Sequence, residues 1–171
     1  MSSQAPPASQ TAAGLMRVIH CRDGVAVAEV GRICIAVWRG SVTDVSFEWQ
    51  RSGLAQVVAR YPQGVAFMCV IEPTAKPPRD ELRRSSTQMI ASHGARLKCV
   101  AVVIEGEGFG AAITRGVISG MALLHTRQTP ADSFSDVRTA LRWIHDYIPI
   151  ETIAHVVAAR VEELRILLDA T

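Results

Sequence analysis

The residues best suited to chemistry follow an apolar run near the middle of the chain. Residues 97–104 read Leu-Lys-Cys-Val-Ala-Val-Val-Ile, and residues 105–110 read Glu-Gly-Glu-Gly-Phe-Gly. Glu105 and Glu107 would lie at the carboxyl end of a buried strand, where α/β proteins gather their sites, so they could form a general acid–base pair. The same spacing is more typical of two hydrated carboxylates on a loop, and we favour that interpretation. Arg115, in the following helix-like run, could reach back to them as a structural ion pair.

The same loop formally matches a dinucleotide-binding fingerprint, Gly106-x-Gly108-x-x-Ala111, between a strand and a helix. That site needs backbone amides and a helix N-terminus facing a pyrophosphate. The flanking glutamates would repel phosphate, and no complete βαβ unit with an acidic ribose ligand follows. We therefore expect a tight turn that brings helix and sheet together, and no cofactor.

Other catalytic and metal-binding patterns are weak. No pair of histidines has the i, i+4 spacing with a carboxylate that marks a zinc site. The four cysteines are far apart and form no C-x-x-C motif, so buried free thiols are expected. No G-x-S-x-G elbow occurs. We expect no catalytic or metal-binding residues, and a protein that is not an enzyme.

Composition limits the class of protein. The chain has 171 residues, 49% of them hydrophobic and 20% charged, which suits one folded domain with a real core. A net charge of +2 predicts no nucleic-acid partner. Residues 1–14 lack the features of a signal peptide, and no run approaches the roughly 18 apolar residues of a membrane span. We therefore expect a cytoplasmic protein with a disordered tail at residues 1–14.

The first part of the chain predicts strands and then a helix. Residues 15–38 contain three strand-like runs separated by turns at 22–24 and 31–32, which predicts an antiparallel meander. In the first run Met16, Val18 and, less clearly, His20 alternate. Residues 41–60 predict a helix capped by Thr43. In that helix Gly53 would be a weak point, and Trp49 falls off the apolar stripe, so it is expected to be partly exposed.

The second part alternates between strands and helices. Residues 65–71 predict a central strand, residues 72–78 a proline-rich loop, and residues 80–93 a helix. After the strand at 97–104 and a helix reaching residue 124, residues 125–134 could hold a short polar edge strand. Ser135 is expected to cap a further helix. The pattern predicts an α/β fold with a mixed sheet of about five or six strands.

The last segment is an added amphipathic helix. Pro149 breaks the chain, and residues 151–170 place an apolar stripe along one face of a helix. This stripe must cover either the domain itself or a second copy of the chain, which would make a homodimer through this helix. The expected organisation is a tail at 1–14, an α/β domain at 15–148 and a helical segment at 149–171.

Residues 25–146 resemble the STAS-like family of bacterial domains, the fold of anti-sigma-factor antagonists, with a more distant likeness to Sec14-type domains. The resemblance rests on four stretches: Trp38-Arg-Gly-Ser-Val-Thr43; Val102-Val-Ile-Glu-Gly-Glu-Gly-Phe-Gly110; Arg115; and Phe134 followed by Ala140-Leu-Arg-Trp143-Ile. It implies a cytoplasmic, non-enzymatic regulatory module that binds a partner protein.

One feature of that family is altered in this chain. The antagonists carry a phosphorylated Ser or Thr at the start of the second helix, in an Asp-Ser-Ser-Gly-like motif. The corresponding loop here reads Glu72-Pro-Thr-Ala-Lys-Pro-Pro-Arg79. Thr74 and Ser85 are the nearest hydroxyls and are the weak phospho-acceptor candidates.

Two functions follow as expectations. The first is a protein-interaction module that uses the glycine-rich loop and the face near the two tryptophans. The alternative is a small-molecule or lipid-binding domain, with its ligand at the strand ends near residues 106–110. The candidate interaction residues are Trp38, Trp49, Glu105, Gly106, Glu107, Gly108, Phe109 and Arg115.

Overall fold

The computed structural model describes residues 15–106, 129–149 and 154–171. The strands are β1 (Met16–Arg22), β2 (Val25–Val30), β3 (Ile33–Trp38), β4 (Val65–Ile71), β5 (Leu97–Ile104) and β6 (Ala131–Phe134). The helices are α1 (Asp44–Arg60), α2 (Asp80–His93), α4 (Val137–His145) and α5 (Ala154–Asp169), with a 3₁₀ turn at Gly94–Arg96. The expected tail at 1–14, the helix expected after residue 110, and Glu107, Gly108, Phe109 and Arg115 lie outside the described residues.

The strands form one mixed sheet in the order β1-β2-β3-β4-β5-β6. The first three strands are antiparallel neighbours, whereas β3, β4, β5 and β6 run parallel. This confirms the α/β class, the N-terminal meander and the central position of β4. The polar segment 131–134 is indeed a short edge strand, paired in parallel with β5. Because β4 and β5 are covered on both faces, their near-continuous apolar sequences suit parallel strands.

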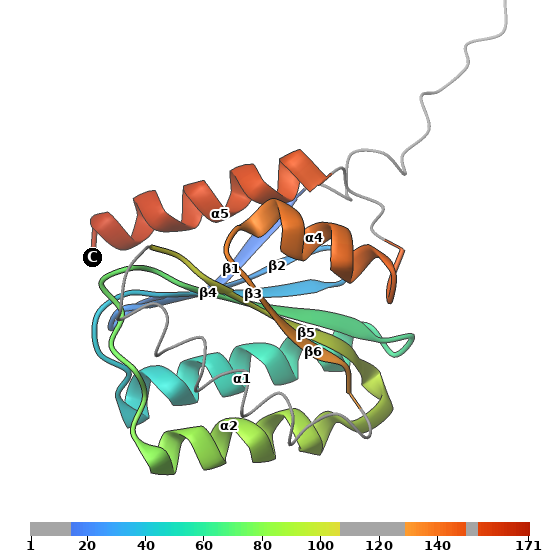
Figure 1. Ribbon diagram of the computed structural model, residues 1–171, viewed down its shortest axis with the longest axis horizontal. Helices are drawn as coiled ribbons and strands as arrows, with labels where there is room; N and C mark the ends of the chain where they lie inside the picture. The colour runs from blue at the N-terminus through green and yellow to red at the C-terminus, as the bar shows by residue number, and fades with distance from the viewer. Residues whose placement is uncertain (1–14, 107–128, 150–153) are drawn as a thin grey trace, which may run out of the picture.

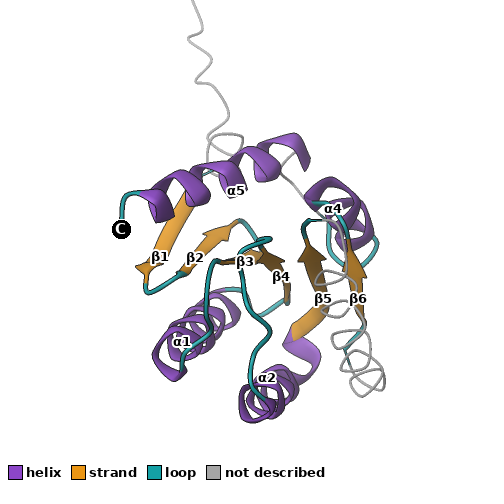
Figure 2. Ribbon diagram, turned by 60° about the vertical axis from the view of Figure 1, so that its left-hand side comes forward, coloured by secondary structure: helices purple, strands orange, loops and turns teal. Residues whose placement is uncertain are grey.

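Helices cover both faces of the sheet (Figures 1 and 2). α1 and α2 lie on one face, and α4 and α5 lie on the other. Each face has its own cluster of buried apolar side chains. The described residues include no helix that is long and apolar enough to cross a membrane.

The C-terminal helix covers its own domain. α5 lies over β1, β2 and β3 and also contacts α4. The predicted stripe consists of Ile153, Val157, Val161, Leu164 and Leu168. Ile153 lies outside the described residues, and the other four are buried in the same cluster as β2 and β3 side chains. The structure therefore shows that the stripe covers the chain's own sheet. Residues 154–169 belong to the folded unit.

A β-bulge in β1 changes the predicted alternation. Val18 pairs with Ala28 and His20 pairs with Val27, so Ile19 is an extra residue in the ladder. A bulge reverses the side-chain phase that follows it. His20 therefore lies on the α1 face of the sheet and Val18 lies on the other face, although strict alternation would place both side chains on one face.

Local chemistry explains how α1 begins and how closely it packs. Thr43 forms a capping box, with its side chain accepting from the Ser46 backbone N–H and its own N–H donating to the Ser46 hydroxyl. Gly53 lies against β2, where an added Cβ would be 2.5 Å from Val27 Cγ1. Glycine was expected to be a weak point, but here it permits the close approach of helix and sheet.

The cap of α4 differs from the prediction. Asp136, not Ser135, is the N-cap, and its carboxylate accepts from the Thr139 backbone N–H at 2.8 Å. Both residues are good caps, so a difference of one position was within the ambiguity of the pattern.

Candidate functional site

Three charged residues lie in a row where the parallel strands end. β3, β4 and β5 finish in register, with Trp38 opposite Ile71 and Ile71 opposite Ile104. The next residue along each strand is charged: Arg39, Glu72 and Glu105. This carboxyl edge is where parallel α/β sheets commonly place functional groups.

Arg39 and Glu72 form the centre of this row. The Arg39 guanidinium donates to both Glu72 carboxylate oxygens, at 2.5 Å from Nε and 3.1 Å from Nη2. Glu72 is only 7% exposed, so the pairing offsets much of the cost of burying its charge. Arg39 also donates to Asp169 at the end of α5. Hydrogen bonding to Glu72 raises the pKa of Arg39 above its ordinary value.

Glu105 is joined to this network by α5. Arg165 Nη2 donates to Glu105 Oε1 at 2.6 Å, and Arg165 Nη1 lies 3.8 Å from Glu72 Oε1. The Glu105 hydrogen bond raises the pKa of Arg165. Arg115, the expected partner, is outside the described residues, and sequence reasoning missed Arg165 because 60 positions separate it from Glu105. Among the described residues the strand-end carboxylates are neutralised by arginines, an arrangement that clamps α5 to the sheet.

Gly106 begins the loop in which a tight turn was predicted, and residues 107–111 of that loop lie outside the described residues. Its φ of +94° is a conformation that side chains rarely adopt. An added Cβ would also lie 3.3 Å from Pro73 in the loop after β4. The glycine therefore lets two strand-end loops approach each other.

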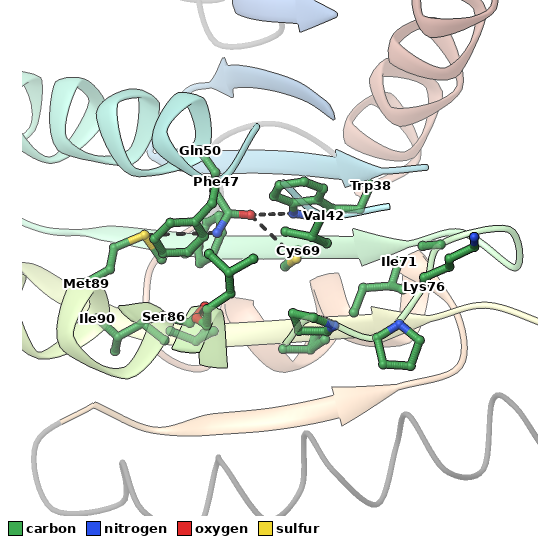
Figure 3. A pocket seen from close by; sticks show the side chains of 17 residues that line it. Trp38, Val42, Phe47, Gln50, Cys69, Ile71, Lys76, Ser86, Met89 and Ile90 are labelled. Atoms are coloured by element: carbon green, nitrogen blue, oxygen red, sulfur yellow. Dashed lines mark hydrogen bonds between the residues drawn. The ribbon is translucent and has the colours of Figure 1, made fainter. Parts of the chain in front are cut away.

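Trp38 is a buried residue rather than a surface contact. Its side chain is 5% exposed, so the expectation that it faces a partner is wrong. Its indole Nε1 donates to Gln50 Oε1 of α1 at 2.5 Å (Figure 3). A buried indole N–H needs an acceptor, and Gln50 supplies one from the neighbouring layer.

Trp49, by contrast, is partly exposed as predicted. It is 39% exposed and stacks on His20 of β1, with ring centroids 4.1 Å apart and planes inclined by 14°. His20 is buried, and burial lowers its pKa. Its Nε2 has no hydrogen-bond partner among the described residues, and Asp23 Oδ2 lies 3.9 Å away. Sequence reasoning could not find this stack because the bulge puts His20 on the α1 face.

The two phospho-acceptor candidates occupy different places. Thr74 is exposed in the proline-rich loop, and Ser85 is half-buried within α2. Neither lies at the start of α2, where Asp80 and Glu81 occupy the first turn. These carboxylates would repel a phosphate dianion, so the helix N-terminus offers no favourable phosphate position.

The cysteines carry no reactive site in the described structure. Cys21, Cys34, Cys69 and Cys99 are free, as expected. The burial that was also expected is found for Cys34 and Cys99, whereas Cys21 and Cys69 are half-buried. Burial raises the pKa of Cys99 to about 12, which leaves its thiol protonated at neutral pH. The described residues contain no group of three His, Cys, Asp or Glu side chains that could hold a metal ion.

No protein-family model matches the chain. No match to a curated protein was found either.

Proposed function

We propose that this protein is a non-enzymatic regulatory module that binds a partner protein over the outer side of α1, with Trp49 as the anchor. The observation that carries the proposal is an exposed aromatic side chain held in one orientation by the stack on buried His20. Tryptophan is enriched among the residues that dominate binding energy. A side chain already ordered before binding loses less conformational entropy in the complex.

The surroundings of Trp49 suit a docking face. Val45 lies one turn earlier on α1 and is 58% exposed, which adds apolar surface beside the indole. Glu48 and Arg51 form an exposed ion pair on the same helix, with Arg51 Nη2 at 2.8 Å from Glu48 Oε1. An apolar centre with charged neighbours has the composition of a transient interface.

Strand pairing is a poorer mode of binding for this partner. β1 is an edge strand, but its bulge at Ile19 interrupts the ladder. Bulges at sheet edges hinder pairing with another chain. We therefore place the contact on side chains of α1 and not on the β1 backbone. We also favour α1 over a homodimer through α5, because α5 buries its apolar stripe against its own sheet.

Two further features support a regulatory role without catalysis. The strand-end carboxylates that could act as acid and base are held by Arg39 and Arg165. The resemblance to the STAS-like family implies the same class of function. We place the protein in the cytoplasm, since four free cysteines suit a reducing compartment.

The test is recovery of a stoichiometric partner from the native host with tagged full-length protein. Trp49→Ala and Val45→Arg should each recover at least tenfold less partner than the wild-type protein. Tyr147→Ala is the matched control, because Tyr147 is 40% exposed on the opposite face and should retain it. Thermal unfolding of each variant separates lost binding from lost folding. Full retention by folded Trp49→Ala and Val45→Arg would overturn the proposal.

A further inference from the structure

A mostly apolar pocket lies between the sheet and the α1–α2 layer (Figure 3). Its volume is about 120 Å³, and side chains of β3, β4, β5, α1 and α2 line it. Residues 75–78 of the proline-rich loop line it as well. The Lys76 backbone N–H donates to Gly40 O at 2.7 Å and so fixes this loop. An apolar cavity of about 150 Å³ binds benzene in another protein, and this somewhat smaller pocket approaches the size needed for one small ring.

One polar side chain in the wall of the pocket is incompletely matched. Gln50 is 5% exposed, and its Oε1 accepts from Trp38 Nε1 at 2.5 Å and from Cys69 Sγ at 4.0 Å. Because indole N–H is only a donor, these contacts set the orientation of the amide. Gln50 Nε2 then faces Met89 Sδ at 4.0 Å, and a thioether is a weak acceptor. A buried amide donor gains from a stronger acceptor.

From these contacts we infer that the pocket binds a small neutral aromatic or alicyclic molecule with one carbonyl or ether-like oxygen, which accepts from Gln50 Nε2. The ring occupies the apolar space beside Phe47, and the oxygen replaces the weak contact with Met89. A neutral ligand is favoured because Lys76, the charged residue among those lining the pocket, is itself exposed to solvent. A buried carboxylate would therefore lack a buried cation.

This site is separate from the proposed docking face. Gln50 faces the sheet from the inner side of α1, whereas Trp49 extends to the β1 edge and is partly exposed. Loss of the partner and loss of the ligand can therefore be measured independently.

The experiment titrates the full-length protein with acetophenone and follows the Trp38 indole N–H resonance by NMR. Saturable shifts are expected, because Trp38 lines the pocket and bonds Gln50. α-Methylstyrene has nearly the same shape but replaces the carbonyl oxygen with a CH₂ group. We expect it to bind about tenfold more weakly, the value of roughly one net hydrogen bond.

A pair of variants locates the site. Ser86 lines the pocket from α2, and its hydroxyl donates within the helix to Leu82 O at 2.9 Å. Ser86→Leu should fill the pocket and reduce acetophenone affinity more than tenfold, while Ser86→Ala should leave it within about twofold. Absence of saturation, equal binding by the two probes, or unchanged binding in folded Ser86→Leu would each overturn the inference.

Discussion

Arg165 of α5 donates to Glu105 at the end of β5, with 2.6 Å between Nη2 and Oε1. This contact joins the last helix to a residue that the sequence marks as a possible catalytic base. The same guanidinium lies 3.8 Å from Glu72 Oε1, and Glu72 is in turn bound by Arg39. The strand-end charges therefore hold the C-terminal helix on the sheet.

Replacing Arg165 should weaken this attachment. Among the described residues, Arg165→Gln leaves Glu105 without an ion-pair partner and leaves Glu72 with Arg39 alone. The free energy of unfolding should therefore fall by about 1–3 kcal/mol. Urea denaturation measures the change. Arg51→Gln is the control, because solvent screens the exposed Arg51–Glu48 pair and its loss should have a much smaller effect. Equal effects of the two substitutions would contradict the clamp.

The core position of α5 gives a second prediction. Leu164 is fully buried against the sheet, whereas Ile166 on the same helix is 67% exposed. Leu164→Ala should lower the free energy of unfolding by about 2–5 kcal/mol, through lost apolar burial and the cavity that remains. Ile166→Ala should change it by less than about 0.5 kcal/mol. A small effect at Leu164 would show that α5 does not pack on its own sheet in solution.

Gly53 should not tolerate alanine. Helix propensity alone predicts that Gly53→Ala stabilises α1 by up to about 1 kcal/mol. The new methyl group would instead lie 2.5 Å from Val27 Cγ1, so we expect a destabilisation of about 1–3 kcal/mol. In a double-mutant cycle Val27→Ala should recover part of that loss, because it removes the clashing group. A stabilised Gly53→Ala protein would show that α1 lies farther from β2.

The buried histidine predicts a pH dependence of stability. Burial lowers the pKa of His20 in the folded state, so the unfolded state takes up a proton first as the pH falls. The free energy of unfolding is therefore unaffected by protonation of His20 above its ordinary pKa of about 6.5, and it decreases as the pH falls below that value. The loss is at most about 1.4 kcal/mol per pH unit for one proton.

Denaturation curves between pH 7.5 and pH 5 measure this dependence. His20→Phe keeps a ring against Trp49 but cannot titrate, so its stability should fall less over this range. His93 also has a pKa lowered by burial and gives a remaining slope of the same sign, which a double variant with His93→Gln should reduce further. Equal slopes for the wild-type protein and His20→Phe would contradict the role of His20.

The sequence alone identified the elements with strong local patterns. Apolar runs marked β4 and β5, the turn signal at residues 22–24 marked the β1–β2 hairpin, and Thr43 marked the start of α1. Each pattern reflects forces within a few residues: side-chain period, capping and backbone sterics. The apolar stripe of α5 was also predicted, but two surfaces could have covered it.

Tertiary structure decided every relation between distant residues. The bulge at Ile19 places His20 on the same face of the sheet as Trp49. Gln50 accepts a hydrogen bond from the buried Trp38 indole, and Arg165 donates to Glu105. Periodicity states which face of an element is apolar, but it does not state which other element will cover that face. Trp49 and Gln50 are neighbours in sequence. The helical pattern predicted that Trp49 would be partly exposed, whereas only the packing of α1 on the sheet placed Gln50 in the wall of the pocket.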